Sequence, residues 1–418
     1  MKQSIKLLLG GAFLLSLPMF LTSCEDILGE WDKPAPVNVI VTPDDNGGTT
    51  ASSTYLAWDA GQSKLVDTPI PEGTPEWTFT SGDVPEGLYK VSSNFTCTEL
   101  LTLKGDVKII LMDNVTMTVE QGIVYDFAGN VGELTIYAQS EGDSKGVLVI
   151  NNDYPQDLGN VFTEAPAINV KTLTIHGGQI DATGDTGATP AQASHYGIEA
   201  TDIIIYGGIV NATGKYGASG IEAITSLEIN GGKVTAKGGD ADGTLSTFGG
   251  VGVSSGTITI NKGDLKATGG NNFAGSASPG VHGISGATIT IKDGSLTSIG
   301  GDAADDGQNG GKGLFAGTVF NIQGGTVDVT GGKGNGTGDG GSGIDTNTII
   351  TACVKVTATG GASTGTGNQG SGFDTAGQIT IPATTYKYEI DGSGTWITTG
   401  LTAIAPPANN VFVIQPNS

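Results

Sequence analysis

Residues 203–215 read IIIYGGIVNATGK, and close variants of this stretch return along the chain at intervals of about 30 residues. Each variant holds an apolar-x-apolar triplet, a turn that contains glycine, a further apolar residue and a small residue. The variants occupy 173–185, 227–240, 258–270, 289–301, 320–332 and, in degraded form, 349–361. A repeat of this length is typical of a solenoid, in which each unit is one turn and stacks on its neighbours.

Each unit contains three short stretches in which apolar and polar residues alternate. Gly197-Ile198-Glu199 is an example of the first, Leu227-Glu228-Ile229 of the second and Val234-Thr235-Ala236 of the third. Alternation with a period of two predicts strands with one buried face, and such strands bury their apolar faces only when units stack.

The sequence therefore predicts an all-β protein. We expect a right-handed, single-stranded parallel β-helix with three short strands in each coil of about 30 residues and a cap at each end. Leucine-rich repeats need a helix-compatible half that this unit lacks. Propeller blades need about 40 residues, and calcium-binding nonapeptide rolls have a shorter period.

Stacking places equivalent residues above one another, which predicts two interior columns. The bulky column contains Ile168, Ile198, Ile221, Val253, Ile284, Leu314, Ile344 and Phe373. The small column contains Ala182, Ala212, Ala236, Ala267, Ser298, Val329 and Ala358. A bulky column facing a small one fills a narrow tube at the packing density of protein interiors.

The first 23 residues predict a signal peptide rather than a part of the fold. A basic start leads into an apolar run, and the segment LTSC at 21–24 closes it. This ending resembles a lipobox, which implies cleavage before Cys24 and acylation of that residue. Glu25 and Asp26 resemble in part the surface-export signal of Bacteroidetes lipoproteins, so we expect an outer-membrane lipoprotein exposed on the cell surface. An ordinary secretory signal with an incidental cysteine is the alternative.

Four further segments follow from composition and from the repeat. Residues 24–54 are expected to hold the lipidated cysteine and a flexible linker, because they are rich in proline, glycine and small polar residues. Residues 55–381 are expected to form the β-helix, with irregular coils and a cap over 55–165 and regular coils over 166–381. Residues 382–418 lose the repeat and are expected to cap the far end.

The charge of the chain excludes several classes of partner. Its 418 residues carry a formal net charge of −23, and all 19 basic residues are lysines. Nucleic acid is a poor partner because phosphate binding needs clustered cations. Anionic lipid surfaces are disfavoured for the same reason, so we expect contact with the membrane through the lipid anchor only. Divalent cations and neutral polymers remain compatible with this charge.

The repeat motifs resemble a known family. Gly-Ile-x-(Ala/Ser), x-(Leu/Ile)-x-Ile-x-Gly-Gly and x-Val-x-Ala-x-Gly-Gly-Asp, with GLYKV at 87–91 and VKIILMDNV at 107–115, resemble bacterial carbohydrate-binding β-helix proteins. The fold of that family is related to that of pectate lyases. The resemblance covers about 80–380 and implies polysaccharide binding, calcium sites on the coils and export. Repetitive, glycine-rich motifs specify a fold better than a ligand.

Acidic residues at equivalent positions suggest a cation site. Neighbouring coils lie about 4.8 Å apart, so Glu199 with Glu222, and Asp345 with Asp374, bring like charges together. Carboxylates in glycine-rich turns, such as Asp240 and its equivalents, suit calcium. We predict calcium ligands among Glu199, Glu222, Asp240, Asp242, Asp302, Asp305, Asp306, Asp345 and Asp374, with solvated surface acids as the alternative.

Aromatic residues in or beside the long loops suggest a carbohydrate-binding surface. These loops follow the third stretch of each coil and leave the tube at one edge. Aromatic faces bury the C–H surfaces of sugars, and nearby amides and acids bond the hydroxyls. The candidates are Tyr196, Tyr216, Phe248, Phe273 and Phe315, and the alternative is that these rings pack the loops onto the coil.

Binding is better supported than catalysis. Paired carboxylates suit glycoside hydrolysis, but these pairs follow from stacking of the repeat. Lyases on this fold use an arginine or lysine base, whereas this chain has no arginine and no loop that gathers lysines. The leading hypothesis is a calcium-stabilised, non-catalytic polysaccharide-binding protein on the cell surface. A structural or adhesive protein that binds other proteins is the second, and a polysaccharide lyase or glycoside hydrolase is the third.

Overall fold

A computed structural model gives the fold. It describes residues 41–43, 49–51, 53–152, 166–184, 195–243, 246, 248–275, 278–347, 349–351, 355–374, 379–380, 386–390, 396–397 and 411–416. The chain divides into two units, 1–51 and 52–418. In the first unit, β1 (Val41–Pro43) and β2 (Thr49–Ala51) form an antiparallel pair. The predicted signal peptide and Cys24 lie outside the described residues.

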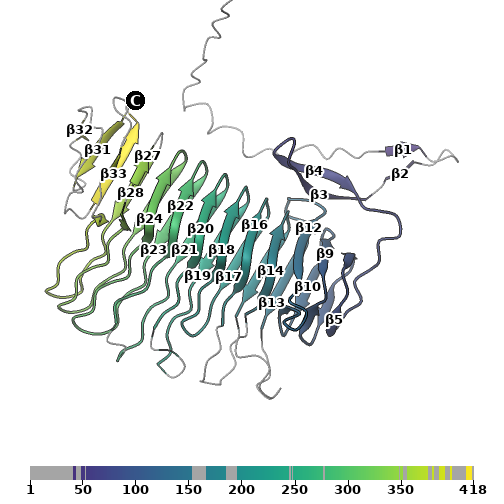
Figure 1. Cartoon of the computed structure of the whole chain (residues 1–418), viewed down its shortest axis with the longest axis horizontal. Helices are drawn as coiled ribbons and strands as arrows, with labels where there is room; N and C mark the ends of the chain where they lie inside the picture. The colour runs from purple at the N-terminus through teal and green to yellow at the C-terminus, as the bar shows by residue number, and fades with distance from the viewer. Residues whose placement is uncertain are drawn as a thin grey trace, which may run out of the picture. The chain divides into compact units, whose positions relative to one another are not determined.

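The second unit winds into a parallel β-helix (Figure 1). Its first coils have three separate strands each. These strands are β5 (Gly82–Val84), β6 (Gly87–Val91) and β7 (Phe95–Cys97); β8 (Leu101–Leu103), β9 (Asp106–Leu111) and β10 (Thr116–Val119); and β11 (Ile123–Tyr125), β12 (Glu133–Ala138) and β13 (Val147–Asn151). The all-β, parallel β-helix prediction is confirmed.

In the following coils the first two predicted stretches join into one bent strand, because parallel pairing continues through the corner between them. In three of these five strand pairs the register shifts locally at the corner. These coils comprise β14 (Ile168–Ile175) and β15 (Gln179–Thr183), β16 (Ile198–Ile205) and β17 (Ile209–Thr213), β18 (Ile221–Ile229) and β19 (Lys233–Lys237), β20 (Val253–Ile260) and β21 (Asp264–Thr268), β22 (Ile284–Ile291) and β23 (Ser295–Ile299), and β24 (Leu314–Ile322) and β25 (Thr326–Thr330). Three separate strands return in β26 (Ile344–Thr346), β27 (Ile349–Thr351) and β28 (Lys355–Thr359), before β29 (Phe373–Asp374) and β30 (Ile379–Thr380).

The core is one continuous column of side chains along the tube. Ile198 lies opposite Ile221, which lies opposite Val253, and all three are at most 1% exposed. The small column pairs in the same way, with Ala212 opposite Ala236 and both at 1% exposure. The register of both predicted columns is therefore confirmed. Because each coil buries its apolar residues against the coils on either side, the hydrophobic stabilisation is shared along the stack.

Different devices cover the two ends of the stack. At the N-terminal end, Trp77, Phe79 and Tyr89 pack edge to face, with ring centroids 5.1 to 5.6 Å apart. At the other end, β33 (Val411–Pro416) pairs antiparallel with β28, and β31 (Tyr386–Ile390) and β32 (Trp396–Ile397) extend that sheet. An added antiparallel strand covers a strand edge that would otherwise be open to another chain.

A hairpin precedes the first coil. β3 (Thr54–Asp59) and β4 (Lys64–Pro69) pair with each other in a separate two-stranded sheet and lie beside the coil near β12 (Figure 1). Within the part of the chain that the structure describes, there is no helix with the length and hydropathy needed to cross a membrane.

Candidate functional site

The long loops form an ordered extension of the coils, which we call the loop layer. It comprises the described residues of 238–252, 269–283, 300–313, 331–343 and 360–372, and the loops run side by side along the lower edge in Figure 1. Each loop leaves the third stretch of a coil through one glycine pair and in most coils returns through another. The architecture of this layer therefore depends on how glycine backbones pack.

Outgoing and returning glycines alternate in one hydrogen-bonded series. Gly311 donates its backbone N–H to Gly301 at 2.8 Å, Gly332 donates to Gly311 at 2.7 Å, and Gly341 donates to Gly332 at 2.9 Å. A Cβ atom on Gly301 would overlap the carbonyl oxygen of Gly270, and a Cβ atom on Gly332 would overlap that of Gly301. The loop layer is thus two backbones thick, without space for side chains between them.

Two of the predicted calcium ligands, Asp240 and Asp302, accept hydrogen bonds from backbone N–H groups of the next coil in the loop layer. The Asp240 carboxylate accepts the backbone N–H of Asn271 at 2.9 Å, the Asn271 amide oxygen accepts that of Asp302 at 3.0 Å, and the Asp302 carboxylate accepts that of Lys333 at 2.7 Å. Burial alone would raise the pKa of Asp240, but the Asn271 N–H and the Lys237 ammonium outweigh it, and the pKa is lowered. These side chains satisfy backbone donors between coils.

Most of the other predicted ligands also accept hydrogen bonds or pair with a lysine. Asp305 accepts the N–H of Gly275, Asp306 that of Thr337 and Asp242 that of Ser246, at 2.7 to 3.2 Å. Glu222 accepts the hydroxyls of Ser219 and Ser254, Glu199 accepts the amide of Asn169, Asp345 pairs with Lys312, and Asp374 is exposed opposite Asp345. Among the described residues no three His, Cys, Asp or Glu side chains gather as a metal site. Calcium binding stays a prediction.

Two of the five predicted sugar-binding rings are nearly half exposed. Phe248 is 49% exposed and Phe273 is 45% exposed, and both stand on adjacent loops of the loop layer. The Phe273 ring lies against Gly243, which has no side chain to displace it. The backbone around Phe248 is held by Ser246, whose hydroxyl donates to the Phe248 carbonyl at 2.7 Å. Both rings therefore stand on bonded backbone rather than on free loops.

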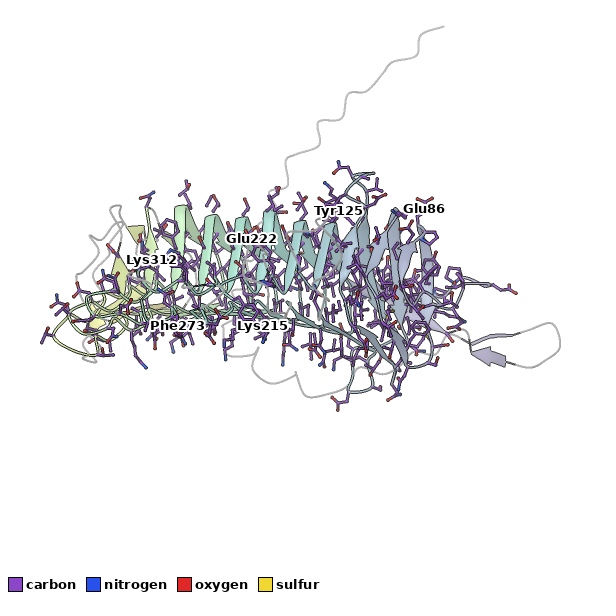
Figure 2. The ribbon with its side chains drawn as sticks, turned by 90° about the horizontal axis from the view of Figure 1, so that it is seen from below. Glu86, Tyr125, Lys215, Glu222, Phe273 and Lys312 are labelled. Atoms are coloured by element: carbon purple, nitrogen blue, oxygen red, sulfur yellow. The ribbon has the colours of Figure 1, made fainter. Side chains whose placement is uncertain are left out.

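The remaining candidate rings pack against neighbours. Tyr216 lies edge to face with His195, with ring centroids 5.2 Å apart. Phe315 is in contact with His282 at 5.4 Å and with the Lys312 ammonium, 4.8 Å from its ring centroid. Tyr196 is partly buried. Figure 2 shows Phe273 and Lys215 along one edge of the molecule, with Glu222 and Lys312 on the face beside it.

The three histidines do not form a catalytic group with one another. His176 stacks between Tyr137 and Tyr206, whereas His195 and His282 contact the rings described above. Burial lowers the pKa of His176 and of His282 to about 4, so both are neutral at pH 7. His176 and His282 therefore pack as uncharged rings on separate coils.

A row of stacked rings on the outside of the coil was not predicted from the sequence. Tyr137, His176 and Tyr206 each follow the last apolar residue of the second stretch on consecutive coils. That position is visible in the repeat, where LTIHGG at 173–178 and IIIYGG at 203–208 place His176 and Tyr206 alike. The row also includes Trp58, which stacks on Tyr206. Because Trp58 lies outside the repeat, the repeat pattern does not indicate this contact.

Comparison with known proteins identifies the repeat type. A family model described as a beta helix repeat matches residues 173–198 and 227–252. Each matched segment runs from the second stretch of one coil to the start of the next. No match is found among curated proteins or among solved structures. The family-model match therefore agrees with the observed coils.

Proposed function

We propose that the protein is a non-catalytic polysaccharide-binding β-helix protein and that Phe248 and Phe273 contact the sugar. The observation that carries the proposal is that two nearly half-exposed phenyl rings stand on adjacent, hydrogen-bonded loops. Exposed rings on rigid backbone bury sugar C–H surfaces without first having to be ordered. The acidic charge of the chain disfavours polyanions, so a neutral polysaccharide is the expected ligand.

The hydrogen bonds and ion pairs of the acidic side chains favour binding over catalysis. Glu222 accepts two serine hydroxyls, and Asp345 pairs with Lys312, so neither carboxylate is held ready to transfer a proton. The stacked loop layer offers instead exposed polar side chains, among them Asp240, Asn271 and Lys333. Such groups suit recognition of sugar hydroxyls along a chain.

Removing both exposed rings tests the proposal. We expect the Phe248→Ala/Phe273→Ala protein to lose about tenfold or more in affinity for the neutral polysaccharide that the natural protein binds best on a glycan array. Phe127→Ala is the matched control, because Phe127 is 42% exposed and lies in another part of the coil. Equal binding by the double variant and the natural protein would contradict the proposal, as would release of cleavage products from the array.

Calcium is proposed as a stabilising ion. The like-charged pair Glu199 and Glu222, in register on adjacent coils, supports it. We expect calcium to raise the melting temperature of the protein and a chelator to reverse the rise. A flat calorimetric titration together with an unchanged melting temperature would exclude calcium, and the array repeated in chelator separates this result from sugar binding.

Display on the outer membrane is proposed from the lipobox. We expect the full-length protein to fractionate with the outer membrane and the Cys24→Ala variant to appear in a soluble fraction, because the acyl chains provide the membrane affinity. Protease treatment of intact cells reports the side on which the protein faces. Membrane retention of Cys24→Ala would overturn the lipid anchor.

A further inference from the structure

The β3–β4 hairpin contacts the coil through side chains and through a hydrogen bond from the backbone N–H of Trp58 to the His176 side chain. Among the described strands it pairs only with itself, and no residue of β3 is fully buried. Its apolar contacts use glycines of the coil: Leu56 lies near Gly177 and Leu65 near Gly207. The hairpin can therefore detach from the coil without breaking a strand pairing of the β-helix.

A stack of four rings joins the hairpin to three consecutive coils. Tyr137 and His176 have ring centroids 4.6 Å apart, and His176 and Tyr206 are 5.0 Å apart, with interplanar angles of 19° and 26°. Trp58 of the hairpin stacks on Tyr206 at 4.5 Å and 21°. The tryptophan thus extends a ring column that the coil itself builds, and Tyr55 adds an edge contact to Tyr137 at 4.7 Å.

One hydrogen bond within this contact depends on protonation. The backbone N–H of Trp58 donates to Nδ1 of His176 at 2.9 Å. Nδ1 accepts this bond only while it carries no proton, since a protonated imidazole is a donor at both nitrogens. His176 is 8% exposed and is flanked by rings on both faces. A charged His176 would therefore lose its bond and face the Trp58 N–H with like polarity.

The surroundings of His176 do not compensate a positive charge. Its pKa is lowered to about 4, and burial is the cause. The titratable and charged groups around it include Tyr55, Asp59, Lys64 and Asp67 of the hairpin, Tyr137 with the Lys108–Asp106 ion pair, and Tyr206 with Glu228. Glu141 also lies nearby, because its carboxylate and the backbone carbonyl of His176 both lie close to Gly207. The two rings in direct contact with His176 are neutral, so the imidazolium gains no ion pair there.

We propose that the β3–β4 hairpin is an acid-sensitive latch, in which protonation of His176 breaks its bond to Trp58 and releases the hairpin from the coil. Release uncovers the ring column of Tyr137, His176 and Tyr206. It also adds the hairpin to the segment that precedes the first coil, which lengthens the membrane tether if the lipid anchor is correct. The latch itself does not depend on the proposed sugar site or on the anchor.

The direction of the pH dependence follows from linkage. In the released state His176 is exposed and its pKa returns toward the ordinary value near 6.5, whereas in the docked state it is about 4. Between these values the released state binds more protons. The equilibrium constant for docking is therefore highest above about pH 6.5. Below that pH it falls about tenfold per pH unit, and it levels off below about pH 4.

Hydrogen exchange of the full mature chain tests the latch. We expect protection factors of residues 54–69, corrected for intrinsic exchange, to fall roughly a hundredfold between about pH 6.5 and pH 4, while β22 stays protected. In His176→Gln the amide oxygen can accept the same N–H but does not titrate, so hairpin protection becomes independent of pH. His282→Gln is the matched control, since His282 is also buried with a pKa of about 4, and it keeps the natural pH response.

Three results would overturn the latch. They are pH-independent protection of the hairpin in the natural protein, a fall that persists in His176→Gln, and exchange of β22 in step with the hairpin. Should His176→Gln fail to fold, Trp58→Ala decides, because it removes the ring and keeps the N–H. It should lower hairpin protection at every pH and preserve the slope, and loss of the slope would count against the proposal.

Discussion

Replacing Gly301 with alanine is expected to destabilise the β-helix by about 3 kcal/mol or more, although only one methyl group is added. The new Cβ would overlap the carbonyl oxygen of Gly270 on the preceding coil. A backbone carbonyl cannot rotate away as a side chain can, so neighbouring coils would have to separate. Separation would break the hydrogen bond from the Gly301 N–H to the Val281 carbonyl, which is 2.8 Å long and joins the two coils.

The measurement is the shift of the melting temperature and of the urea midpoint. Gly142→Ala is the matched control, because a Cβ at Gly142 meets no atom within 4 Å. It should change stability by less than about 0.5 kcal/mol. If Gly301→Ala proves as stable as Gly142→Ala, the loop layer is not close-packed backbone and its proposed rigidity is wrong.

Replacing Phe320 with alanine is expected to cost about 3 to 5 kcal/mol, the second large effect. Phe320 is fully buried, and its side chain is the largest by volume among the fully buried side chains of the described residues. It stands opposite Ile289 of the preceding coil and opposite residue Ile349 of the next. Its removal leaves a cavity between coils, because the hydrogen-bonded strands on either side cannot collapse into the space.

Chemical unfolding of two further variants separates a cavity from other causes. Phe320→Leu keeps most of the volume and should lose less than about 1.5 kcal/mol. Phe127→Ala removes an exposed ring of the same type and should have a small effect. Equal losses for Phe320→Ala and Phe127→Ala would show that coil stacking does not depend on this part of the core.

The coil was predictable from particular residues because its contacts repeat. Ile198 and Ile221 occupy the same place in successive units, and stacking alone brings them together. The same reasoning placed Glu199 opposite Glu222 correctly. What it did not predict was the partner of each acid, because Glu222 also accepts from Ser254 of the following coil and from Ser219 of its own.

The loop layer was harder to predict because its order comes from backbone atoms. The repeat suggested loops that vary and project, and the glycine pairs were visible in it. Their alternating bonds, such as Gly332 to Gly311, join segments that no side-chain pattern relates. The exposure of Phe273 and the contact of Phe315 with Lys312 likewise depend on how each loop returns to the coil.

The sequence by itself determined the β-helix, its period and both interior columns, because alternation sets which side chains point inward and a fixed period sets which coil neighbours meet. Only the tertiary structure decided which rings are exposed, which acids bond backbone N–H groups, and where the β3–β4 hairpin lies. The physical reason is distance along the chain. The atoms that engage Asp302, Phe273 and His176 belong to other coils or to the hairpin, and they meet only after the coils have stacked.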